Sequence, residues 1–208
     1  MASNLTIAKS AGKSVGIIIL AAGRASRMNG VDKLLEQIDG VHLITRVGRV
    51  CLASGAEQIT AVLRANDAKR RSALPVGIEV IANPDASEGM ATSLAVGVRA
   101  LAQTCQAAIV VLADMPDVTS RDIDALIAAF DPKNGTSICQ AITPAGELGH
   151  PVLFGREHFD ELSNLTGDNG ARKIIAAHPD AIRYVETEGE GARTDLDTPQ
   201  DWVTYRNR

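Results

Sequence analysis

The sequence is poor in the features that mark several classes of protein. Of its 208 residues only 3% are aromatic, too few for the stacking surfaces on which single-stranded nucleic acids bind. The formal net charge is −4, which disfavours general attraction to nucleic acid or to an anionic membrane. No apolar run approaches the roughly 20 residues of a membrane-spanning helix. We therefore expect neither nucleic acid nor membrane as a partner, and any anion must bind at a local cationic site.

Cysteine is also sparse. The three cysteines, Cys51, Cys105 and Cys139, are odd in number and far apart in the chain. This spacing predicts neither a disulfide framework nor a structural zinc site, and it fits a cytoplasmic location. Residues 1–14 are small and polar and lack the apolar segment of a signal peptide, so we expect a flexible N-terminal tail.

The rest of the composition is typical of a globular protein. Hydrophobic residues make up 45% and charged residues 22%, and the length suits one domain with a substantial core. Continuous apolar runs at 15–20 and 107–112 predict central strands that are buried on both faces of a parallel sheet. The other elements expected in the first 130 residues are strands at 58–63 and 78–82, and helices over 43–51, from about 88 to 101, and after Thr119. This alternation predicts an α/β fold with a mostly parallel sheet.

The second half of the chain has a less regular pattern. The elements expected there are short strands at 136–142 and 151–154, a helix over 171–177, a strand at 181–185 and a closing helix over 200–205. No repeat, low-complexity segment or linker separates the two halves. We therefore expect a single domain over residues 15–208.

A turn rich in small residues and cations follows the first predicted strand. The sequence Leu-Ala-Ala-Gly at 20–23 would let backbone N–H groups approach phosphate oxygens closely, and Arg24, Arg27 and Lys33 follow it. The turn is not a Walker A loop, and Ala25 fills the second glycine position of the dinucleotide fingerprint. The pattern favours an anion-binding loop. The alternative is a tight turn whose arginines are simply solvated.

Carboxylates stand at two further positions. Asp114 follows the strand at 107–112, at the sheet edge where ligands of α/β proteins collect, and it suits Mg²⁺, which prefers oxygen ligands. A turn or helix cap is the alternative for Asp114. Near the end of the chain, Asp195 and Asp197 would share one face of an extended segment. Thr198 is expected to cap the last helix, with proline at its first position.

Six motifs occur in order over about residues 15–205. They are LAAGRASRM with Lys33 after it, SEGMATSLAVG, LADMP, GHPVLF, GDNGAR and DLDTPQD. Together they resemble the MobA-like nucleotidyltransferases of molybdenum cofactor maturation, and among these the cytidylyltransferases. The resemblance implies the Rossmann-like three-layer α/β/α fold of the nucleotide-diphospho-sugar transferases. It also implies a nucleotide-binding half at 15–130 and an acceptor-binding half at 131–208.

The resemblance assigns residues to four tasks. The nucleotide-binding residues that it implies are Leu20, Ala21, Ala22, Gly23, Arg27, Lys33, Asn83, Gly89 and Ser93. Asp114 and Asp197 would hold Mg²⁺, and Arg27, Lys33 and Asp114 would be catalytic. The acceptor-binding residues that it implies are His150, Pro151, Gly167, Asp168, Gly170 and Arg172. His150 could instead be a plain turn residue. No cysteine or histidine stands near it at metal-ligand spacing, so the sequence disfavours a zinc role for it.

The reaction implied by the resemblance is transfer of CMP from CTP to the terminal phosphate of molybdopterin, with release of pyrophosphate. Alanine at position 22 resembles the cytidylyl branch. The product would be the cytosine dinucleotide cofactor of molybdenum hydroxylases, so such a hydroxylase or its chaperone is the implied protein partner. Three alternatives stay open: a related transferase using GTP or another phosphorylated acceptor, a nicotinamide oxidoreductase, and a non-catalytic carrier of the molybdenum cofactor.

Overall fold

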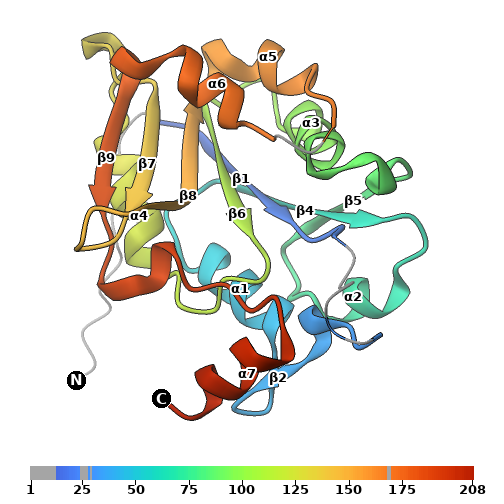
Figure 1. Ribbon diagram of the computed structural model, residues 1–208. Helices are drawn as coiled ribbons and strands as arrows, with labels where there is room; N and C mark the ends of the chain where they lie inside the picture. Colours follow the sequence, from blue (N-terminus) through green and yellow to red (C-terminus); the bar gives the residue numbers. More distant parts are fainter. Residues whose placement is uncertain (1–12, 24–27, 29, 168–169) are drawn as a thin grey trace, which may run out of the picture.

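The computed structural model describes residues 13–23, 28, 30–167 and 170–208, and it is built around a seven-stranded sheet (Figure 1). The strands lie in the order β5 (Glu79–Asn83), β4 (Gln58–Arg64), β1 (Val15–Leu20), β6 (Ala107–Leu112), β8 (Leu148–Gly155), β7 (Ile138–Ile142) and β9 (Ile182–Glu186). Strand β8 is antiparallel to β6 and β7, and the other pairs are parallel. The expected α/β fold with a mostly parallel sheet is therefore confirmed.

The central strands β1 and β6 are apolar along their whole length because both faces of the sheet are covered. Ile17 and Ile19 point into one hydrophobic cluster, while Ile18 points into another on the opposite face. Ile109 and Val110 of β6 divide between the two clusters in the same way. A strand buried on both faces reads as a continuous apolar run rather than as an alternating one, which is the pattern of both segments.

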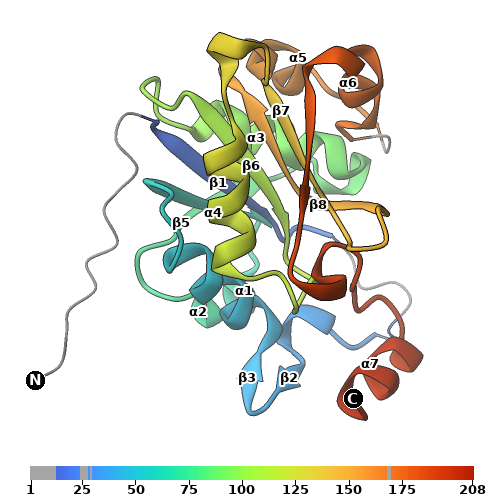
Figure 2. The ribbon, with the colours of Figure 1, turned by 90° about the vertical axis from the view of Figure 1, so that its left-hand side faces the viewer.

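Helices cover the two faces. One cluster contains side chains from α1 (Leu43–Leu52), α4 (Ser120–Ala129) and α7 (Pro199–Arg206), and α2 (Ala68–Ala73) packs beside it. The other contains side chains from α3 (Met90–Ala100), α5 (Phe159–Ser163) and α6 (Arg172–Ala177). Figures 1 and 2 show α4 and α3 on opposite sides of the sheet. The arrangement has the three layers that the resemblance implies.

Short elements complete the described part of the chain. They are the hairpin β2 (Gln37–Ile38) and β3 (Val41–His42), and the 3₁₀ helices η1 (Lys33–Leu35), η2 (Ala86–Glu88), η3 (Pro132–Asn134), η4 (Arg156–His158), η5 (Pro179–Ala181) and η6 (Gly189–Ala192). The helix expected from about residue 88 begins instead at Met90, because Gly89, with a φ of 118°, separates η2 from α3. Helix α2 and the hairpin lack a strong apolar period, and the sequence did not predict them.

The cap expected for the last helix is present. The Thr198 hydroxyl accepts a hydrogen bond from the Asp201 backbone N–H at 3.2 Å, and the Asp201 carboxylate accepts one from the Thr198 N–H at 2.7 Å. Pro199 occupies the first helical position. Among the helices of the described residues, none is both long and apolar enough to cross a membrane.

Candidate active site

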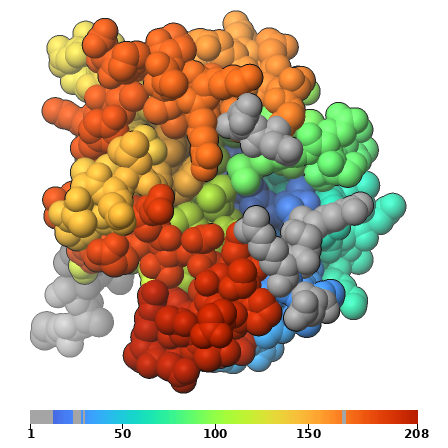
Figure 3. Space-filling model, viewed as in Figure 1, coloured from blue at the N-terminus to red at the C-terminus, as the bar shows by residue number. Residues whose placement is uncertain are grey.

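The motif residues gather at one edge of the sheet. The parallel strands β1, β5 and β6 end there, so the turn after Leu20, Asn83 and the segment after Leu112 lie along the same edge. Strand β8 is antiparallel and pairs Val152 with Val110, so it starts at this edge and brings His150 to it. Figure 3 shows a hollow on this side, in which atoms near the end of β6, in yellow-green, are visible between the red C-terminal segment below and the orange segment above.

An ammonium group lies between two carboxylates at this edge. Lys33 Nζ is 2.6 Å from Asp114 Oδ2 and also donates to Asp197 Oδ1. The exposed fractions of the three side chains are 12%, 22% and 34% for Lys33, Asp114 and Asp197. Burial opposes the charged form of Lys33, but the attraction of the two carboxylates outweighs it and raises the pKa of the amine. The lysine is therefore a firmly charged ammonium.

Backbone contacts bring Asp197 to the end of β6. The Leu196 N–H donates to the Asp114 carbonyl oxygen at 3.1 Å, and the Asp197 N–H donates to the Asp201 carboxylate at 3.1 Å. Just before this segment, η6 packs on the start of β8 so closely that a Cβ at Gly149 would lie 1.9 Å from the Ala192 carbonyl oxygen. The C-terminal segment is thus held against the sheet at Ala192 and at Leu196, just before Asp197.

A third carboxylate, which the sequence did not single out as a site residue, belongs to the same group. Burial raises the pKa of Asp195, and the negative charges of Asp197 and Asp114 raise it further. Three carboxylates around one ammonium leave an excess of negative charge. In addition, Asp114 Oδ1 is buried and has no hydrogen-bond partner within the described residues. Carboxylate oxygens, excess negative charge and an unsatisfied oxygen fit the divalent metal ion that this family of folds implies.

His150 and Arg172 flank the carboxylates. Burial lowers the pKa of His150, the nearby Arg172 acts in the same direction, and the attraction of Asp114 offsets this only in part. The imidazole is therefore neutral at neutral pH, and its Nδ1 is buried without a partner in the described part of the chain. The peptide bond from His150 to Pro151 is cis. Arg172 is the first residue of α6.

The loop of the predicted acceptor site meets the start of α3. The Gly167 carbonyl oxygen accepts a hydrogen bond from the Ala91 N–H at 3.3 Å, which places this loop beside Gly89. Gly89, Gly167 and Gly170 have φ angles of 118°, 75° and 51°, which favour glycine over residues with a Cβ. Two motifs that lie about 80 residues apart in the sequence are thereby joined at one edge of the site. Asp168 lies outside the described residues.

Asn83 and Ser93 lie beneath this edge rather than on its surface. Asn83 is fully buried, and its amide donates to the hydroxyl oxygens of Thr92 at 3.0 Å and Ser93 at 2.9 Å. Its carbonyl oxygen accepts from the Asp85 N–H at 3.0 Å. Both polar ends of Asn83 are thus used to fix the first turn of α3 against the end of β5.

Comparison with known proteins agrees with this geometry. A profile of the MobA-like NTP transferase domain matches residues 17–182. The chain belongs to this family. It is 28% identical over 203 residues to the purine catabolism protein PucB of Bacillus subtilis, covering 91% of this chain and 94% of the relative. It is 27% identical over 196 residues to the molybdenum cofactor cytidylyltransferase of Escherichia coli, with 94% and 97% coverage.

Two further comparisons give another relative and a solved structure. The nicotine blue oxidoreductase of Paenarthrobacter nicotinovorans is 26% identical over 186 residues, with 87% and 91% coverage. The crystal structure of Rv0371c from Mycobacterium tuberculosis superposes with a TM-score of 0.81 at 25% identity, over 94% of this chain and 99% of that one. The family and the fold identify the chain as a nucleotidyltransferase.

Arg70 is a buried residue next to the loop at 20–23 that the sequence analysis missed. Its side chain is 1% exposed, and its Nε and Nη2 donate to the two carboxylate oxygens of Asp32 at 2.8 and 2.9 Å. Its Nη1 donates to the carbonyl oxygens of Ala21 at 2.6 Å and Gly23 at 3.0 Å. One buried guanidinium therefore fixes the turn after β1 to the residue that precedes Lys33.

No local signal in the sequence marks Arg70. It stands in the polar stretch Ala-Lys-Arg-Arg-Ser-Ala, which reads as a solvated cationic helix face. Its ion-pair partner Asp67 is three residues away, but Asp32 and Ala21 lie 38 and 49 residues away. The arginines that the sequence did single out, Arg24 and Arg27, lie outside the described residues. Arg27 thus stays a prediction as a phosphate ligand.

Proposed function

We propose that this nucleotidyltransferase transfers CMP from CTP to the terminal phosphate of molybdopterin and releases pyrophosphate. The observation that carries the proposal is the Lys33 ammonium beside Asp114 and Asp197 at the carboxyl end of the central strands. The likeness to the E. coli molybdenum cofactor cytidylyltransferase over most of both chains supports the choice of nucleotide and acceptor. The product would pass in the cytoplasm to a molybdenum hydroxylase or its chaperone.

The proposed nucleophile needs no general base. A terminal phosphate oxygen is already ionised at neutral pH, so the enzyme has only to bring two polyanions together and to disperse negative charge. Lys33 suits the second task because its pKa is raised and the ammonium persists throughout the working pH range. In the proposed reaction Lys33 turns from the carboxylates toward the phosphates and stabilises the departing pyrophosphate, together with Arg27.

In the proposed reaction the carboxylates would bind the metal ion. Asp114 and Asp197 would hold Mg²⁺, with Asp195 adding negative charge beside them. When bound, the ion supplies charge neutralisation at the reacting phosphate. The carboxylates also hold Lys33 in place before substrate binds, since the ammonium contacts both of them.

The loop from Leu20 to Gly23 would receive the nucleotide. Arg70 fixes the carbonyl oxygens of this turn on its buried side, so the opposite side can present N–H groups to a phosphate. Ala22, which is 3% exposed, is the position on which the proposed choice of cytosine depends. Gly89 would border the base and ribose, with Asn83 and Ser93 fixing the helix turn that follows it.

The acceptor would lie on the other side of the carboxylates. Arg172 offers a guanidinium for its phosphate, and the neutral His150 offers a hydrogen-bonding ring without adding charge. Pro151, Gly167, Asp168 and Gly170 would form the remaining wall. The contact of Gly167 with Ala91 keeps this wall next to the nucleotide side, as transfer between two bound substrates requires.

A single assay tests the proposal. The purified protein is incubated with Mg²⁺, molybdopterin and one of CTP, GTP, ATP or UTP, and pyrophosphate release and the dinucleotide mass are measured. We expect pyrophosphate only when CTP and molybdopterin are both present. Turnover with GTP instead of CTP would show that the enzyme uses guanine rather than cytosine nucleotides. A lack of pyrophosphate with all four nucleotides would overturn the proposed reaction.

An oxidoreductase activity is the second candidate, and the relative named nicotine blue oxidoreductase favours it. Against it, Ala25 fills the second glycine position of the dinucleotide-binding fingerprint. Fluorescence titration with NADH and NADPH separates the two candidates. Binding of either coenzyme in the micromolar range would favour the oxidoreductase, and its absence would leave the transferase.

A further inference from the structure

A second group of ionisable side chains lies at the opposite edge of the sheet from Lys33. Gly155, the last residue of β8, pairs with Ala107 at the amino end of β6, whereas Asp114 follows the carboxyl end of β6. His158 stands three residues after Gly155, at the end of η4. The group is therefore separated from the active site by the length of β6.

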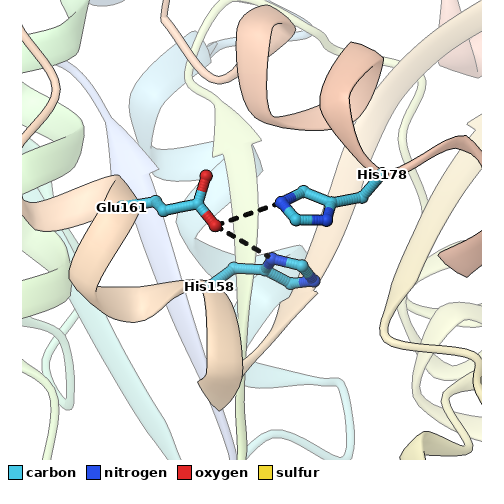
Figure 4. A group of neighbouring side chains, drawn as sticks. All are labelled: His158, Glu161 and His178. Atoms are coloured by element: carbon cyan, nitrogen blue, oxygen red, sulfur yellow. Dashed lines mark hydrogen bonds and ion pairs between the residues drawn. The ribbon is translucent and has the colours of Figure 1, made fainter.

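Two imidazoles and a carboxylate from separate helices face one another there (Figure 4). His158 ends η4, Glu161 lies in α5 and His178 follows α6. One donor atom from each residue lies within 4.8 Å of the other two. Glu161 Oε1 is 3.1 Å from His178 Nε2 and 4.0 Å from His158 Nδ1, and the ring centroids are 4.7 Å apart.

His158 has a nitrogen that the protein leaves unused. Its ring is 3% exposed, and its Nε2 is 2.9 Å from the Ser137 hydroxyl oxygen. Its Nδ1 points toward Glu161, yet it is buried without a hydrogen-bond partner within the described residues. A buried nitrogen without a partner carries a desolvation cost, so its position calls for a ligand.

The surroundings also keep His158 neutral. Burial lowers the pKa of this imidazole, and the neighbouring His178 lowers it further. When the Ser137 oxygen accepts the Nε2 hydrogen, Nδ1 carries only its lone pair. A hydrogen bond on the far nitrogen that sets the tautomer is the usual support of a metal-ligating histidine.

We propose that His158, Glu161 and His178 form a binding site for a divalent transition-metal ion of the zinc type. Two imidazole nitrogens and a carboxylate oxygen are typical Zn²⁺ ligands, and water would complete a tetrahedron. Tetrahedral ligand bonds of about 2.0–2.2 Å place the ligand atoms roughly 3.3–3.6 Å apart. The two separations from Glu161 Oε1, 3.1 and 4.0 Å, bracket this value, and Glu161 is half exposed and free to adjust.

The ion would join α5 to the end of α6. Glu161 lies in α5, which packs on α3, while His178 ends α6, which begins at Arg172. Binding at His178 would therefore fix α6 at the end opposite to Arg172. The proposed site stands on its own geometry and does not depend on the identity of the nucleotide or the acceptor.

Metal titration of the full chain tests this proposal. Zn²⁺ alone is titrated into metal-free protein by calorimetry, and Co²⁺ is used as a second probe for its visible absorption. We expect a Zn²⁺ site, separate from any ion held at Asp114, whose affinity falls at least tenfold in His178→Ala and in Glu161→Gln. At free Zn²⁺ near 100 times Kd, the melting temperature should rise by roughly 5–10 °C in the wild type and not in His178→Ala.

Two control variants separate this site from other ligands. Asp114→Asn removes an active-site carboxylate, and His42→Ala removes an imidazole whose Nδ1 contacts the Leu35 carbonyl oxygen far from the cluster. Both should keep the Zn²⁺ affinity of the wild type. Loss of binding in Asp114→Asn alone, unchanged affinity in His178→Ala and Glu161→Gln, or no Zn²⁺ binding by the wild type would each overturn the proposal.

Discussion

Asp32 and Lys33 are neighbours in the chain, but they belong to two ionic groups that differ in kind. Asp32 holds Arg70, which is 1% exposed and whose guanidinium is satisfied by carboxylate and carbonyl oxygens. Lys33 reaches Asp114 and Asp197, where negative charge is in excess and Asp114 Oδ1 has no partner among the described residues. The satisfied group holds the loop in shape, and the unsatisfied group is ready to exchange partners with a substrate or a metal.

The largest effect is expected for Asp114→Asn. Pyrophosphate release in the molybdopterin assay should fall about a thousandfold, or roughly 4 kcal/mol, because a carboxylate proposed to hold Mg²⁺ loses its charge. The matched control is Asp117→Asn, since that carboxylate is engaged by Tyr205 and Arg208. It should retain activity at temperatures where it is folded. A Mg²⁺ titration of Asp114→Asn that matched the wild type would reject the metal assignment.

Arg70→Met breaks the satisfied group. Asp32 and the carbonyl oxygens of Ala21 and Gly23 lose their buried donor, so the free energy of unfolding should fall by about 3 kcal/mol. This corresponds to a melting temperature lower by roughly 6–12 °C, measured by thermal denaturation. Arg71→Met, at an exposed position on the same helix, should change it little. Equal effects of the two variants would show that the buried contacts of Arg70 do not contribute to the free energy of unfolding beyond those of an exposed arginine.

Lys33→Met removes the ammonium from the unsatisfied group. We expect kcat to fall about a hundredfold, or roughly 2.7 kcal/mol, because charge on the leaving pyrophosphate is no longer stabilised. KM for CTP should change much less, since the loop proposed to bind the nucleotide is held by Arg70. Lys69→Met, at an exposed position on α2, provides the control. A KM effect larger than the kcat effect would assign Lys33 to binding instead of catalysis.

The smallest effect is expected for Asp195→Asn. The pKa of Asp195 is raised by burial and by its carboxylate neighbours, so its contribution to stability is full below the unfolded-state pKa and is lost as pH rises through the folded-state pKa. The variant should therefore melt about 1–2 °C above the wild type at pH 7. The difference should shrink as the pH falls toward about 4. A lower melting temperature at pH 7 would mean that Asp195 makes a favourable contact when ionised.

The sequence could predict elements whose signal is local. The apolar runs became the central strands β1 and β6, and Thr198 caps the last helix through Asp201. Asp114 could be placed at a ligand-binding edge because it directly follows a buried strand. The motifs assigned Lys33 to the nucleotide and Asp114 and Asp197 to Mg²⁺, but nothing in the sequence indicated that the Lys33 ammonium contacts both carboxylates.

Contacts between distant segments could not be predicted in this way. Arg70 meets Asp32 across 38 residues, and its own segment carries no apolar period that would indicate burial. His158 and Glu161 stand one helical turn apart, but His178 joins them only because α6 packs beside α5. A sequence gives the side chains, but which of their polar atoms lack a hydrogen-bond partner depends on how the chain packs.

Because the C-terminal segment follows the last strand of the sheet, the sheet and the proposed active site depend on different parts of the chain. Strand β9 ends at Glu186, so all seven strands of the sheet precede η6 and Asp197. A protease that cut the chain between residues 187 and 196 would leave the sheet whole while it freed one of the two carboxylates that hold Lys33. Such a nicked protein would keep all seven strands and the loop at 20–23 in one fragment. Its catalytic competence would then be governed by how tightly a cleaved tail rebinds.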